Sequence, residues 1–166
     1  GLLVVFLGGL VYYFSSLDSD TSSSAAIECT SGNNSIVKAA GRGKVERVDE
    51  CIKLGADVSL KDPNGWSALH AAAYNGNMGI ARKLMATGKV DIESRTNREE
   101  TPLYLASMKA VQVALKSKDS AEIKKIYDMI NYLKSSGAST KVADENGQNL
   151  YSRVQSSPEL LKLLFD

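Results

Sequence analysis

Residues 67–76, which read SALHAAAYNG, decide the fold because a related stretch returns 34 residues later. There, residues 101–106 read TPLYLA, so a hydroxyl residue and a leucine two positions on recur at the same spacing. Self-similarity at a period near 33 residues is typical of stacked helical repeats. In such a stack each repeat contacts only its neighbours. The sequence therefore predicts an all-α solenoid.

The clearest copy runs from residue 62 to residue 92, and its parts have physical roles. Gly65 suits a tight turn, because a positive φ is easily adopted only by glycine. Ser67 can cap the first helix by accepting a hydrogen bond from a free backbone N–H. Gly76 separates the two antiparallel helices. Three apolar residues of the second helix recur at helical spacing and are predicted to face the core: Ile80, Leu84 and Met85.

This copy resembles an ankyrin repeat almost position by position, except that Val90 is one residue extra. A degraded copy precedes it and ends in LGADV at residues 54–58, and two weaker copies follow it. The resemblance implies an ankyrin-repeat solenoid of about four helix-turn-helix repeats over residues 31–166. The repeats are expected at about residues 31–61, 62–95, 96–143 and 144–166.

The third copy is longer than the family period by about 15 residues. The extra length falls around residues 108–120, where apolar residues continue through Leu115. We therefore expect its first helix to continue, followed by a turn and a new helix capped by Asp119 or Ser120. The lengthening is either a second contact surface or a variation without function.

The composition excludes one class of partner. The chain has 166 residues, with 20 basic and 19 acidic side chains and a net charge of +1. Nucleic-acid binding rests on concentrated positive charge, so no nucleic acid is expected as a partner. We expect a monomer.

The first fourteen residues, GLLVVFLGGLVYYF, carry no charge and fit no repeat. They are shorter than the roughly 20 residues of a membrane-spanning helix but match the apolar core of an export signal. Residues 1–16 are interpreted as a signal peptide or an N-terminal anchor, and residues 17–30 as a polar linker. Both alternatives predict a periplasmic location, either free or anchored in the inner membrane and facing the periplasm.

Cys29 and Cys51 are the two cysteines, and both lie near the first repeat. In an exported chain they are candidates for one disulfide between the N-terminal segment and the second helix of that repeat. The alternative is that Cys51, which aligns with Leu84, is a small buried apolar residue. The export signal favours the disulfide.

No pattern in the chain predicts catalysis. His70 is the single histidine, and in the family this histidine hydrogen-bonds backbone between repeats. Without a second histidine or a C-x-x-C pair there is no zinc spacing, and no phosphate-binding glycine motif occurs. We therefore predict no catalytic residue, no metal site, no cofactor and no enzymatic activity.

The resemblance implies a protein partner on the concave side, formed by the loop before each first helix and that helix's exposed face. The corresponding positions here are Asn64, Trp66, Tyr74, Asn75, Arg98, Glu100, Met108 and Lys109. Tryptophan, tyrosine and arginine are enriched in interface hot spots. Alternatively, Trp66 only packs against a neighbouring loop.

Short ankyrin proteins with export signals resemble a bacterial periplasmic type. That resemblance implies an immunity or self-protection role, in which the chain inhibits or sequesters a secreted or periplasmic enzyme such as a cell-wall hydrolase. Two alternatives are a membrane-anchored scaffold and a periplasmic stress protein that handles a small ligand.

Overall fold

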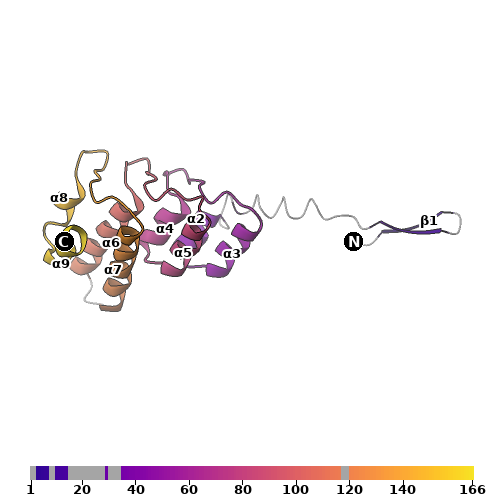
Figure 1. Cartoon of the computed structure of the whole chain (residues 1–166), viewed down its shortest axis with the longest axis horizontal. Coiled ribbons are helices and arrows are strands. Elements are labelled where there is room, and N and C mark those ends of the chain that lie inside the picture. Colours follow the sequence, from indigo (N-terminus) through magenta and orange to yellow (C-terminus); the bar gives the residue numbers. More distant parts are fainter. Residues whose placement is uncertain (1–2, 8–9, 15–28, 30–34, 117–119) are drawn as a thin grey trace.

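The computed structural model describes residues 3–7, 10–14, 29, 35–116 and 120–166 (Figure 1). From residue 35 onward these residues form a row of helices, which confirms the predicted all-α solenoid. The helices are α2 (Ile36–Gly41), α3 (Val45–Lys53), α4 (Ala68–Tyr74), α5 (Met78–Ala86), α6 (Pro102–Lys116), α7 (Ser120–Ser135), α8 (Leu150–Val154) and α9 (Pro158–Phe165).

Two short strands precede the repeats, β1 (Leu3–Leu7) and β2 (Leu10–Phe14). They pair antiparallel, with Val5 opposite Tyr12. Among the described residues, no helix combines the length and the apolar character that a membrane crossing requires. The assignment of residues 1–16 to a signal peptide or an anchor stays a prediction.

The helices form two layers because each repeat contributes one helix to each. The first helices pack in the order α2, α4, α6 and α8, and the second helices in the order α3, α5, α7 and α9. The connecting loops project together on one side of the row (Figure 1). Each pair therefore buries its apolar face against its neighbours, as a repeat stack requires.

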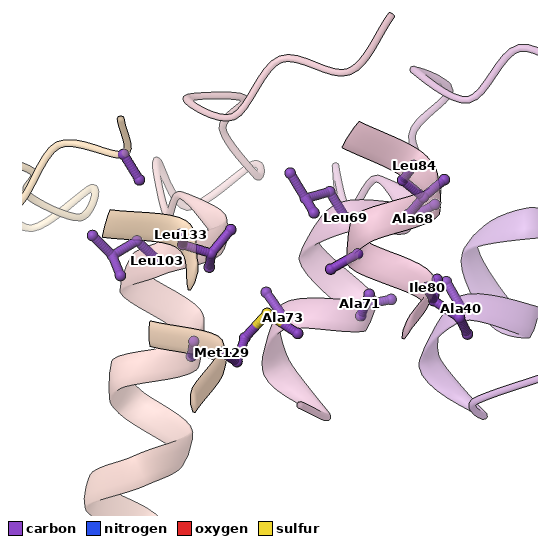
Figure 2. Close-up of a cluster of buried hydrophobic side chains, with 14 of the residues drawn as sticks. Ala40, Ala68, Leu69, Ala71, Ala73, Ile80, Leu84, Leu103, Met129 and Leu133 are labelled. Carbon is purple, nitrogen blue, oxygen red and sulfur yellow. The ribbon is translucent and has the colours of Figure 1, made fainter. Parts of the chain in front are cut away.

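Small side chains let the first helices come close together. Ala40 of α2 and both Ala72 and Ala73 of α4 are fully buried, and Ala71 is almost so. Figure 2 shows Ala40, Ala71 and Ala73 in one cluster with larger side chains such as Leu84 and Met129. Of the three residues predicted to face the core, Ile80 and Leu84 are fully buried, and Met85 is partly buried against the cluster.

The lengthened third repeat has the predicted form. Helix α6 runs without interruption for 15 residues and α7 for 16, whereas α5 has 9. Ser120 is the first residue of α7, and Asp119 lies outside the described residues. The start of α7 crosses the turn at Gly76, where a Cβ would lie 2.9 Å from Lys125 Cγ and from Ile126 Cδ1. Gly76 therefore permits this crossing, both by its φ of 64° and by its missing side chain.

A disulfide closes the N-terminal end of the stack. Cys29 and Cys51 are bonded, and both are fully buried. The carbonyl of Cys29 also accepts a hydrogen bond from Ile36 N at 2.7 Å, which fixes the entry into α2. The short first repeat is thus joined covalently to the segment before it.

A buried polar network closes the C-terminal end. Tyr104 Oη donates to Asp144 Oδ2 at 2.9 Å, and Arg153 Nη2 donates to the same oxygen at 2.7 Å. The side chain of Asp144 is only 4% exposed, and the bond from Arg153 is the largest cause that lowers the pKa of Asp144 to about 2. The network joins the third repeat to the last one.

Replacing Leu84 by alanine should lower the free energy of unfolding by about 2–5 kcal/mol, because the change leaves a cavity in the core. Urea denaturation followed by circular dichroism measures this loss. Leu115→Ala is the matched control, since Leu115 is 78% exposed and its truncation should change stability by less than about 0.5 kcal/mol. Equal effects of the two variants would contradict the assigned core.

Reducing the disulfide should destabilise the protein by about 3 kcal/mol, because the bond closes a loop between cysteines 22 residues apart. Thermal unfolding with and without dithiothreitol measures the change. The chain has two cysteines, so the Cys29→Ala/Cys51→Ala variant should unfold at the same temperature as the reduced wild type. Dithiothreitol should not change the unfolding temperature of this variant. A midpoint that reductant leaves unchanged would argue that the bond constrains nothing.

Candidate functional site

The loop before α4 is held by one carboxylate. Asp62 Oδ1 accepts hydrogen bonds from Asn64 N and Trp66 N, both at 2.9 Å. Gly65 has a φ of 77°, and a Cβ there would lie 2.5 Å from Asn97 N. The glycine predicted for this turn is thus required both by the backbone conformation and by the neighbouring loop.

Neighbouring loops are joined by hydrogen bonds, so they form one continuous surface. Asn97 N donates to Asn64 O at 3.1 Å, and its side-chain amide donates to Pro63 O at 2.8 Å. One repeat further on, Glu145 N donates to Arg98 O at 2.9 Å. These hydrogen bonds hold each loop at a fixed position relative to the corresponding loop of the next repeat.

His70 of α4 holds the loop of the next repeat in place through hydrogen bonds to its backbone. Its Nδ1 accepts from Ser67 N at 3.1 Å, so Nε2 carries the proton and donates to Ser94 O at 2.9 Å and Glu100 O at 3.2 Å. Burial lowers the pKa of His70 to about 4, which keeps the ring neutral. The predicted structural role of His70 is confirmed, since both ring nitrogens are engaged with backbone and with Ser67.

A groove of about 490 Å³ lies between the loops and the first helices of the second and third repeats. Its floor combines aromatic and aliphatic side chains, and its rim is polar. The lining residues are Asn64, Trp66, Tyr74, Asn97, Arg98, Glu100, Leu105 and Met108.

Two aromatic rings define one wall of this groove. Trp66 and Tyr74 meet edge to face with their centroids 5.5 Å apart. Lys109 Nζ lies 5.3 Å from the Tyr74 ring centroid, and Tyr74 Oη donates to Gln112 Oε1 at 3.2 Å. Tyr74 is thus held between Trp66 and the lengthened helix α6, which orients the aromatic pair before any partner arrives.

The rim carries both charges. Arg98 Nε lies 3.3 Å from Glu145 Oε1, and both side chains are largely exposed. Glu100 Oε2 accepts from Thr96 Oγ1 at 3.2 Å. An apolar floor with a polar, wet rim is the usual arrangement of a protein-binding surface.

The structure brings together most of the residues predicted to bind a partner. Six of them line the groove: Asn64, Trp66, Tyr74, Arg98, Glu100 and Met108. Lys109 lies at the groove's edge over Tyr74, whereas Asn75 is the C-cap residue of α4 and its side-chain amide donates to Ala71 O at 3.0 Å. Whether these residues bind a partner stays a prediction.

Sequence reasoning missed Leu105 and Gln112. Leu105 lies three positions before Met108 and Gln112 four positions after it, so all three share one face of α6. This helical spacing was the available signal. Sequence reasoning also missed a second groove of about 810 Å³ between α5 and α7.

The described residues offer no site for metal chemistry, since no three histidine, cysteine or acidic side chains come together there. The Trp66–Tyr74 groove combines aromatic and aliphatic side chains with a polar rim. It presents an arrangement for recognition.

Residues 36–125 match the family model described as ankyrin repeats (3 copies). This match covers more than half of the 166 residues, so the chain belongs to the ankyrin-repeat family. Ankyrin repeats are protein-binding modules and are typically non-catalytic, and a stack of this kind implies a protein partner.

Several known proteins share part of this sequence. Ankyrin repeat and SOCS box protein 2 of Rattus norvegicus is 36% identical over 72 residues, which are 43% of this chain and 11% of that protein. Notch-regulated ankyrin repeat-containing protein of Xenopus tropicalis is 43% identical over 53 residues, which are 32% of this chain and 46% of that protein. Delta-latroinsectotoxin-Lt1a of Latrodectus tredecimguttatus is 43% identical over 68 residues, 39% of this chain and 6% of the toxin. The chain therefore spans less than half the length of each.

Lowering the pH should destabilise the protein through His70. The folded-state pKa of His70 is about 4 and the ordinary value is 6.5, so the unfolded chain takes up the proton first as the pH falls. The stabilisation from the buried neutral His70 is fully present above its ordinary pKa. It is lost as the pH falls from the ordinary pKa to the folded-state pKa. We expect a loss of about 2 kcal/mol between neutral pH and about pH 5.

Urea denaturation at several pH values measures this dependence. His70→Gln is the control, since glutamine does not titrate and the variant should lack this part of the slope. A wild-type slope equal to that of the variant would show that His70 does not titrate on unfolding.

Proposed function

We propose that the chain is a non-catalytic protein that works in the periplasm, where it binds and inhibits or sequesters an exported enzyme. The Trp66–Tyr74 groove carries this proposal. It sets a preorganised aromatic pair inside a polar rim, and tryptophan and tyrosine are among the residue types enriched in binding hot spots.

The Cys29–Cys51 bond supports the proposed compartment. Disulfides persist in oxidising compartments such as the periplasm and are rare in the cytosol. Both cysteines are fully buried, and the bond ties the segment before the first repeat to helix α3 of that repeat. The uncharged stretch at residues 1–14 is in keeping with export.

The most specific part of the proposal is the class of enzyme that the chain binds. A cell-wall hydrolase is favoured by the resemblance to small exported bacterial ankyrin proteins with immunity or self-protection roles. Inhibition requires that the bound surface block the hydrolase's active site. A groove backed by fixed loops is suited to this because little ordering accompanies binding.

Trp66→Ala should weaken capture of the enzyme from a periplasmic extract by about 30-fold, which corresponds to a hot-spot loss of about 2 kcal/mol. Immobilised wild type and variant are compared by the amount of enzyme they retain. The hydrolase eluted from the wild type should lose its activity on purified cell wall when free wild type is added back, but not when Trp66→Ala is added.

Tyr151→Ala is the matched control, because Tyr151 is an aromatic residue of the last repeat and is 56% exposed. It should retain the enzyme as the wild type does. Equal retention by wild type and Trp66→Ala, with both correctly folded by circular dichroism, would remove the groove as the binding site. Retention of an enzyme that keeps full activity would contradict inhibition.

A further inference from the structure

A second groove lies on the second helices, away from the loops that border the Trp66–Tyr74 groove. It has a volume of about 810 Å³ and is bordered by α5 and α7. The residues that matter for its chemistry are Met78, Arg82, Lys124, Lys125, Asp128 and Tyr132. None of them belongs to the Trp66–Tyr74 groove.

This groove exists because α7 is longer than its counterpart. Helix α7 has 16 residues and α5 has 9, and the difference of seven residues extends α7 by about 10 Å. The added turns cross Gly76, where the aliphatic stem of Lys125 packs against the backbone. The lengthened third repeat therefore builds one wall of the groove.

The charges of the groove are not balanced. Lys124 Nζ lies 2.6 Å from Asp128 Oδ2, which uses the single carboxylate among the lining residues. Within the part of the chain that the structure describes, neither Arg82 nor Lys125 has a carboxylate within 4.0 Å. Both side chains are exposed, and no carboxylate among the described residues neutralises either charge.

The floor between these cations is partly apolar. The Tyr132 ring lies under the guanidinium of Arg82, with Arg82 Cζ 5.5 Å from the ring centroid. Tyr132 and Met78 are both half-buried. A ligand that fits must therefore present negative charge at the edges and tolerate an apolar contact between them.

We propose that the α5–α7 groove is a second binding surface and that it takes an acidic polypeptide segment. Carboxylates of the segment pair with Arg82 and Lys125, while an apolar side chain between them lies on Tyr132 and Met78. Two unpaired cations are too few for a nucleic acid, whose binding rests on many phosphate contacts. The surface lies on other helices than the Trp66–Tyr74 groove, so both can be occupied at once.

The test uses a short fluorescein-labelled peptide with the repeat Glu-Glu-Tyr and measures its binding to the full chain by fluorescence anisotropy at low salt. The same peptide with glutamine in place of glutamate is the probe control. We expect the acidic peptide to bind, the glutamine peptide not to bind, and added salt to weaken the complex. Equal binding of both peptides would overturn the proposal.

Variants locate the peptide. Arg82→Gln/Lys125→Gln should weaken binding about tenfold, and Asp128→Asn should strengthen it because the variant removes the groove's carboxylate and frees Lys124. Lys53→Gln/Lys162→Gln changes the net charge equally at exposed lysines elsewhere and should have little effect. An equal loss in both double variants would show non-specific attraction and overturn the site.

Trp66→Ala separates this proposal from the proposed function. The variant should bind the acidic peptide as the wild type does, whatever it does to enzyme capture. Loss of peptide binding in Trp66→Ala would place the peptide in the other groove and overturn the assignment. Binding of free citrate as tightly as the peptide would overturn a polypeptide ligand.

Discussion

The close approach of the first helices is the constraint on which the rest of the structure depends. The alanines at positions 40, 71, 72 and 73 present only methyl groups at buried positions of α2 and α4, so neighbouring first helices can pack closely. This spacing brings successive loops within hydrogen-bonding distance, as Asn97 and Asn64 show. The binding groove exists because those loops and helices are held in register. A larger residue in the alanine run would separate the helices and the loops together.

The residue at one repeat position contacts the following repeat in two different ways. In the second repeat His70 bonds to backbone carbonyls of the next loop, and in the third repeat Tyr104 occupies the matching place. Tyr104 reaches a side chain, Asp144, which Arg153 also holds. The second repeat thus uses a neutral imidazole against the backbone of the next loop, whereas the third repeat uses a tyrosine hydroxyl against a buried carboxylate that is paired with Arg153.

Much of the fold could be predicted because its causes are local. The cap at Ser67, the turn at Gly65 and the continuous helix α6 follow from residues a few positions apart. Six of the groove residues could be predicted too, because shifting the repeat by one period carries each loop position onto the same face. The α5–α7 groove and the Tyr104–Asp144–Arg153 network could not be predicted. Both include contacts between residues that are 40 or more positions apart, such as Lys125 with Gly76 and Tyr104 with Asp144, and no periodic pattern encodes these.

The disulfide also makes the two ends of the stack unequal in their resistance to a pulling force. A pull on the chain before Cys29 passes through the sulfur–sulfur bond to Cys51 and enters α3 directly, so α2 carries no load. A pull at residue 166 instead meets α9 and α8, which hydrogen bonds, one ion pair and packing hold in place. The fourth repeat can therefore unfold under a pulling force that the first repeat withstands. Forced unfolding that starts at α9 therefore meets the weaker side of the described stack.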